Sequence, residues 1–153
     1  MTVVKRLEVM AVVLVLLVFP VGREGHAAEW LDWVVYRIGA ELGMSDAQYQ
    51  LGLLFEKQSG LSANRQALSW YRAAADQGHS EAQVRLGILL EKGKGVAPNL
   101  VESYVFYNIA ALKGDKAAEE NRDALARRMT LEQIERAQKI TRERMKLDAG
   151  QDR

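Results

Sequence analysis

Apolar residues recur at helical spacing along most of this chain. Within Ala47–Phe55 they occupy positions i, i+4, i+7 and i+8, which fall on one face of an α-helix. The same spacing returns within Ala82–Leu90, and a further amphipathic stretch runs over Leu131–Met145. Most of the turns between these stretches contain glycine. The pattern therefore predicts a series of amphipathic helices that pack on one another.

The predicted helix ends carry residue types that satisfy free backbone groups. Three pairs have the spacing of a capping box: Ser45 with Gln48, Ser80 with Gln83, and Thr130 with Gln133. Three glycines suit the left-handed position that closes a helix: Gly43, Gly78 and Gly114. Gly52 and Gly87 instead lie inside predicted helices, where glycine costs about 1 kcal/mol relative to alanine. Their recurrence predicts that another backbone approaches closely at both places.

The helical pattern is also repeated. The segment Val35–Gln48 returns as Trp70–Gln83 at an offset of 35 residues, and Phe106-Tyr107 begins a third copy. A single unit of this size cannot bury its apolar face alone, so the repetition indicates a stack of helix-turn-helix units. Trp30 and Trp33 precede the first copy, and we expect them to cover its open apolar end or to anchor a partner. Such stacks usually serve as binding scaffolds.

The first residues predict export. Lys5 and Arg6 precede an apolar run over residues 9–19, and small residues follow at Ala27 and Ala28, which is the layout of a secretory signal peptide. The run is shorter than the roughly 20 residues that a membrane span needs. We therefore expect cleavage of residues 1–28 and a periplasmic or secreted mature chain without stable membrane insertion. A retained membrane anchor is the alternative.

The charge balance and the reactive side chains of the sequence bear on two classes of function, nucleic-acid binding and enzymatic catalysis. Acidic and basic residues balance after residue 28, so nucleic acid is not an expected partner. The chain has no cysteine, and His79 is the single histidine beyond residue 28, with no activated nucleophile beside it in the sequence. No residue cluster has metal-ligand spacing, and no glycine-rich phosphate loop follows a strand. We predict a protein that is not an enzyme and has no catalytic residue, cofactor or metal.

The turns complete a motif that both units share. In the second unit its residues are Ala82-Gln83, Leu86-Gly87, Gly93-Lys94-Gly95-Val96, Tyr107, Ala110-Ala111 and Gly114. In the first unit they are Ala47-Gln48, Leu51-Gly52, Gly60-Leu61, Trp70-Tyr71, Ala74-Ala75 and Gly78. This motif resembles the Sel-one-like repeat, a branch of the tetratricopeptide-like α/α solenoids, and the resemblance covers roughly residues 33–140.

The resemblance implies an all-α fold: a right-handed α/α solenoid of about two and a half repeats with a C-terminal capping helix. The repeat domain is expected at 29–147, as a half-repeat at 29–44, repeats at 45–79 and 80–115, and closing helices at 116–147. A flexible tail follows at 148–153.

The implied function is that of a bacterial adaptor. It would bind an envelope or secreted protein in its concave groove, and its oligomeric state stays open. Two alternatives remain: a cell-wall-active or β-lactam-hydrolysing enzyme of a related branch, and a membrane-tethered regulator. That enzymatic branch is rich in cysteine, which this chain lacks.

A second apolar pair lies beside the core face of each first helix. By analogy with tetratricopeptide-like stacks, this side faces the groove, and a glutamate extends it in each unit. The candidate partner-binding residues are Tyr49, Leu53, Glu56, Val84, Ile88 and Glu91. The alternative interpretation is that the next repeat or the terminal helix buries the apolar members of this set.

Overall fold

A computed structural model describes residues 26–151 of the chain, with side chains described for residues 30–146. Seven α-helices make up this part: α2 (His26–Glu41), α3 (Ser45–Lys57), α4 (Leu61–Asp76), α5 (Ser80–Lys92), α6 (Leu100–Leu112), α7 (Lys116–Ala126) and α8 (Leu131–Gln151). The predicted signal peptide at 1–28 lies outside the described residues except for its last three, which begin α2. At the other end, α8 continues into the segment that was predicted to be a flexible tail.

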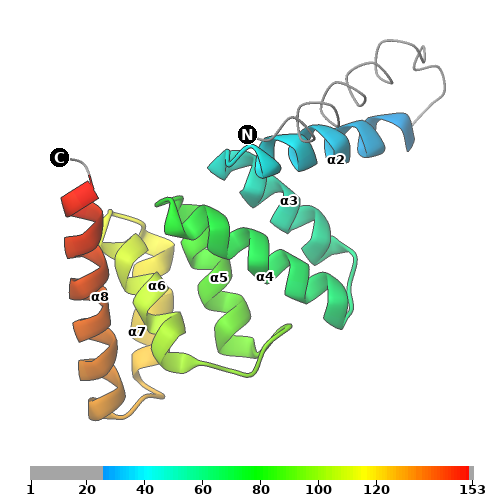
Figure 1. The fold of residues 1–153 in the computed structure, drawn as a ribbon. Coiled ribbons are helices and arrows are strands. Elements are labelled where there is room, and N and C mark those ends of the chain that lie inside the picture. The colour runs from blue at the N-terminus through cyan, green and yellow to red at the C-terminus, as the bar shows by residue number, and fades with distance from the viewer. Residues whose placement is uncertain (1–25, 152–153) are drawn as a thin grey trace.

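The helices stack in chain order as an α/α solenoid (Figure 1). The two full repeats are the pairs α3 with α4 and α5 with α6, and α4 packs against α5 to join them. The helix α2 packs on α3, while α6 carries both α7 and α8. The predicted all-α repeat architecture is therefore confirmed, with α8 covering the last full repeat through α6.

Two hydrophobic clusters meet at α6. The first cluster extends from Ala40 of α2 to Phe106 of α6, and the second includes Tyr107 of α6, Leu125 of α7 and Ala137 of α8. Seven of the thirteen residues of α6 are buried, on every side of the helix. A helix that is apolar all round must be enclosed by its neighbours, and α4, α5, α7 and α8 provide that enclosure. None of the helices within residues 26–151 is long and apolar enough to cross a membrane.

Several helix ends have the conformation that the sequence predicts. The Thr130 amide donates to Gln133 Oε1 at 3.0 Å, and the Gln133 amide donates to Thr130 Oγ1 at 3.2 Å, which confirms the capping box. Asp115 caps α7 by accepting from the Ala118 amide at 2.9 Å. Positive φ angles of 87°, 88° and 96° confirm the left-handed conformation predicted for Gly43, Gly78 and Gly114.

The predicted capping boxes at Ser45 and Ser80 are wrong. Both serines are already the first helical residues of α3 and α5, so the cap is the residue before each. The two glutamines are buried and donate to a carbonyl near the end of the preceding helix: Gln48 to Ala40 at 3.2 Å and Gln83 to Ala75 at 3.1 Å. The last carbonyls of a helix lack intrahelical partners. Each glutamine shares such a carbonyl with the amide of the closing glycine, Gly43 or Gly78, and so fastens the next helix to the previous one.

Candidate functional site

Each full repeat is held together by a tyrosine of its second helix that lies over a glycine of its first. A Cβ atom built on Gly52 would stand 2.5 Å from the ring of Tyr71, and one on Gly87 would stand 2.5 Å from the ring of Tyr107. Both tyrosines have 0% relative exposure. The close approach predicted at the two glycines is confirmed, but the approaching group is an aromatic ring and not a backbone.

The hydroxyl of each tyrosine reaches a glutamate one helical turn beyond the glycine. Tyr71 Oη donates to Glu56 Oε2 at 2.7 Å, and Tyr107 Oη donates to Glu91 Oε2 at 3.1 Å. Burial, together with the adjacent carboxylate, raises the pKa of both tyrosine hydroxyls far above the ordinary value. Burial disfavours the phenolate, so both hydroxyls remain hydrogen-bond donors at physiological pH.

Both glutamates also bind an arginine from the next unit. Arg85 of α5 lies with Nη1 3.7 Å from Glu56 Oε2, and Arg128, just after α7, contacts Glu91 Oε1. The glutamate side chains are 21% exposed, and those of Arg85 and Arg128 are 43% and 59% exposed. A tyrosine–glutamate–arginine arrangement therefore occurs twice. Glu56 and Arg85 connect α3 with α5, and Glu91 and Arg128 connect α5 with the turn after α7. Two of the predicted partner-binding residues are the central members of this arrangement.

The four apolar residues predicted to bind a partner are half-buried. Tyr49 and Leu53 pack against the first hydrophobic cluster, and Val84 and Ile88 pack against the second. The ring of Tyr49 also stacks on His79, with 4.7 Å between ring centroids. These side chains thus contribute to packing while part of their surface stays accessible next to the glutamates.

His79 has a structural position that sequence reasoning missed. Its side chain is only 12% exposed, its Nδ1 accepts from the Ala82 amide at 3.3 Å, and it thereby caps α5. Its Nε2 lies 3.3 Å from Asp46 Oδ1, and its Nδ1 lies 3.3 Å from Glu81 Oε2. Among residues 26–151, no group of three or more histidines, cysteines or carboxylates is arranged to hold a metal ion.

The N-terminal end of the described chain exposes aromatic side chains. Trp30 is 42% exposed and Trp33 is 37% exposed. The guanidinium of Arg37 lies 5.6 Å from the centroid of the Trp33 ring. Among the described helices, α2 packs chiefly on α3.

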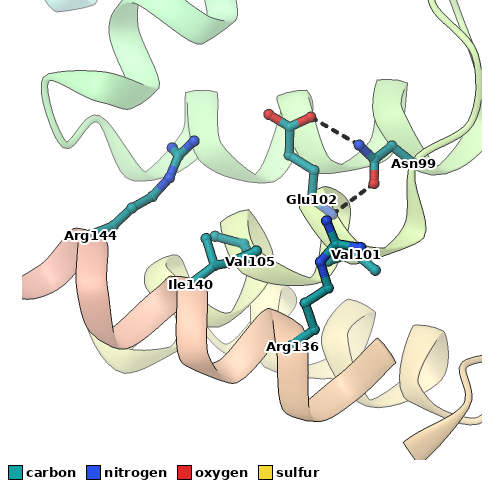
Figure 2. Close-up of a pocket in the computed structure, with 7 residues that line it drawn as sticks. All are labelled: Asn99, Val101, Glu102, Val105, Arg136, Ile140 and Arg144. Atoms are coloured by element: carbon teal, nitrogen blue, oxygen red, sulfur yellow. Dashed lines mark hydrogen bonds between the residues drawn. The ribbon is translucent and has the colours of Figure 1, made fainter. Parts of the chain in front are cut away.

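A hollow of about 340 Å³ lies between the second helices α6 and α8 (Figure 2). Its lining combines apolar and charged side chains: Asn99, Val101, Glu102, Val105, Arg136, Ile140 and Arg144. Sequence reasoning did not find this hollow. The positions of Arg136, Ile140 and Arg144 on one helical face were visible in the sequence, but their distance from α6 depends on how α8 docks.

The repeated units match a known family. The model of the Sel1 repeat matches residues 45–79 and 80–115. The chain therefore contains two Sel1 repeats. Proteins built from Sel1 repeats are generally scaffolds for protein–protein interaction and typically have no catalytic role.

Two solved structures are similar to this Sel1-like repeat chain. One is a protective antigen present in uropathogenic Escherichia coli strains, which displays an SLR fold; it is 28% identical, with a TM-score of 0.68 over 78% of this chain and 25% of its own. The other is a Sel1 repeat protein from Oxalobacter formigenes, 38% identical, with a TM-score of 0.53 over 63% of this chain and 38% of its own. The chain thus matches well under half the length of either protein. No curated protein matches it.

Proposed function

We propose that this Sel1-like repeat protein is an exported, non-enzymatic scaffold that binds another protein of the bacterial cell envelope or its surroundings. The proposed binding surface, called here the first-helix face, consists of Tyr49, Leu53, Glu56, Val84, Ile88 and Glu91 together with Arg85 and Arg128. The observation that carries this proposal is the doubled tyrosine–glutamate–arginine arrangement. It holds charged groups in fixed positions beside partly accessible apolar side chains.

The fixed geometry favours recognition of a folded partner. Glu56 and Glu91 are held by buried hydroxyls from behind and by arginines at the side. Groups that are already ordered lose less conformational entropy when a partner binds. Alternating carboxylate and guanidinium groups also select a partner with the complementary order of charges. The exposed guanidinium groups would contact acidic residues of that partner.

A site-specific crosslinking experiment tests the surface. A photo-reactive amino acid is placed at Val84, which leaves the charged groups of the first-helix face in place, and, as the control, at Arg65, an exposed residue of α4. After irradiation of intact cells, position 84 should give a discrete crosslinked species that mass spectrometry identifies and that position 65 does not give. The same species from both positions, or none from position 84, would count against the first-helix face.

Export is supported by the basic, apolar and small-residue order of residues 1–28. Mass spectrometry of the protein recovered from the periplasm or the medium tests it. We expect a new N-terminus close to residue 28. An intact N-terminus in a membrane fraction would instead establish the membrane-tethered alternative.

A further inference from the structure

The wall of the hollow formed by α8 is a row of three side chains. Arg136, Ile140 and Arg144 follow one another at four-residue intervals and point toward α6 (Figure 2). With a rise of about 1.5 Å per residue, the two arginines stand about 12 Å apart along the helix. Ile140 lies between them and is half-buried. The row therefore alternates cationic, apolar and cationic groups.

The opposite wall supplies an apolar surface. Val101 and Val105 of α6 line the hollow together with Ile140. Val105 is buried and Val101 is half-buried. The volume of about 340 Å³ falls within the range of ordinary ligand sites, roughly 300–1,000 Å³. Val101 and Ile140 pack against the hydrophobic cluster that contains Val105, so their accessible surface forms an apolar floor on which one side chain of a ligand can lie.

The acidic group of the hollow is already neutralised. Glu102 Oε1 accepts from Arg72 Nη1 at 2.6 Å, and Glu102 Oε2 accepts from Asn99 Nδ2 at 3.3 Å. Arg72 is therefore committed to Glu102, and its guanidinium also lies 5.9 Å from the centroid of the Phe106 ring. Because Glu102 is paired with Arg72, it does not neutralise the charge of Arg136 and Arg144.

The two arginines of α8 differ in their own contacts. Arg144 stacks over Phe106 at 4.9 Å, and its Nη1 lies 3.5 Å from Asp76 Oδ1, a carboxylate that is 56% exposed. Arg136 is exposed and forms no ion pair with any side chain that the structure describes. Over residues 131–146, α8 has five basic and three acidic side chains. The hollow thus carries an excess of positive charge that is centred on Arg136.

We propose that this hollow binds an extended acidic peptide segment of a partner protein, with one apolar residue between two carboxylates. An extended chain rises about 3.3 Å per residue, so carboxylates four residues apart span about 13 Å, which matches the two arginines. The middle residue then lies over Ile140, Val101 and Val105. Guanidinium groups can bind carboxylates through paired hydrogen bonds, and at Arg144 the carboxylate of the peptide replaces the exposed carboxylate of Asp76. The site is separate from the first-helix face, and the inference stands whether or not that face binds a partner.

A designed peptide tests this site directly. The capped sequence Gly-Asp-Ala-Leu-Ala-Asp-Gly has the same side-chain order in both directions, so the orientation of the bound chain need not be known. Titration into the isotope-labelled full chain, followed by NMR, should shift amide signals of residues 99–105 and 136–144. The control peptide with asparagine in place of both aspartates should bind at least fivefold more weakly.

Two variants with the same change in net charge separate a site from general attraction. Arg136→Glu should weaken binding of the acidic peptide at least tenfold. Lys139→Glu, which changes an exposed residue of α8 outside the lining, should change it less than threefold. Equal losses in both variants, or no binding of the peptide by the unchanged chain, would overturn the proposal. So would a change in oligomeric state with Arg136→Glu at unchanged peptide affinity, since the hollow would then be a self-association surface.

Discussion

The hydroxyl of Tyr107 donates a hydrogen bond to the carboxylate of Glu91 at 3.1 Å, across the interface between the two helices of one repeat. The same contact joins Tyr71 and Glu56 in the preceding repeat. In both repeats the tyrosine ring fits against a glycine that precedes the glutamate by four residues. In each repeat the tyrosine ring thus packs the two helices together, and its hydroxyl positions the charged glutamate at the surface.

Gly87→Ala should destabilise the protein, although alanine is the better helix former. The new methyl group would stand 2.5 Å from the buried ring of Tyr107, which has no space to move. Overpacking of this kind costs about 1–3 kcal/mol, and we expect a loss in that range in urea denaturation. Ser69→Ala, at an exposed position of α4, is the control and should change stability by less than about 0.5 kcal/mol. A stabilised Gly87→Ala variant would refute the role of ring contact.

Tyr107→Phe keeps the ring and removes the hydrogen bond to Glu91. Hydrogen bonds to charged groups contribute about 1.5–3 kcal/mol, and partial exposure of Glu91 places the expected loss near the lower limit. Tyr104→Phe is the matched control in the same helix, because Tyr104 is buried and makes no side-chain hydrogen bond within residues 30–146. It should lose less than about 0.5 kcal/mol. Equal losses would show that the Glu91 contact is not a stabilising one.

The buried hydroxyl of Tyr107 should make the stability of the protein depend on pH in the alkaline range. Burial and the nearby carboxylate raise the pKa of the Tyr107 hydroxyl, whereas an unfolded tyrosine ionises near pH 10. Above about pH 10 the unfolded chain releases a proton that the folded chain keeps, so the free energy of unfolding falls as pH rises. Each such tyrosine contributes a slope of about 1.4 kcal/mol per pH unit. Below that pH the proton is present in both states and this group has no effect.

Urea denaturation at pH values from about 9 to 11 measures this slope. In Tyr107→Phe the free energy of unfolding should fall less steeply with pH than in the unchanged protein. The difference should be the slope that one proton contributes. Identical slopes would mean that the Tyr107 hydroxyl ionises equally well in the folded chain.

Lys113→Gln should stabilise the second repeat by providing a missing hydrogen bond. Gln77 Nε2 donates to Gln48 Oε1 at 2.7 Å, but the equivalent oxygen, Gln83 Oε1, is buried and has no hydrogen-bond partner among residues 30–146. Lys113 occupies the position that corresponds to Gln77, followed in each case by the closing glycine. The change also removes the hydrogen bond from Lys113 Nζ to the Gly78 carbonyl at 3.1 Å, so we expect a net gain of less than about 1 kcal/mol in thermal or urea unfolding. Lys113→Ala is the control, and an equal gain in that variant would contradict the explanation.

Local spacing and repetition predicted much of this fold, and tertiary contacts explain the rest. Gly52 and Gly87 stood out because they recur inside helices, but the sequence did not show that Tyr71 and Tyr107 cover them. A signal was present: the tyrosines and the glutamates recur with the glycines. Ser45 and Gln48 have the spacing of a capping box, which is all that the sequence shows. Gln48 is instead buried against the preceding helix, and that contact depends on tertiary structure.

The candidate surfaces were less predictable than the fold. Glu56 and Glu91 were recognised as candidates by their position beside the core face, whereas their arginine partners come from the following unit. The partner of Glu91, Arg128, lies outside the repeat motif. The hollow depends on the docking of α8 against α6, which helical periodicity does not determine.

Binding affinity tests the central claim, that the first-helix face recognises a protein partner through its ordered charges. With the partner identified by crosslinking, isothermal titration calorimetry should measure the affinity of the unchanged chain and of three variants. Arg85→Glu and Arg128→Glu should each weaken binding at least tenfold, which corresponds to about 1.4 kcal/mol. Arg65→Glu on α4 should change it less than threefold. Unchanged affinity in both first-helix variants, with folding confirmed by circular dichroism, would contradict the account.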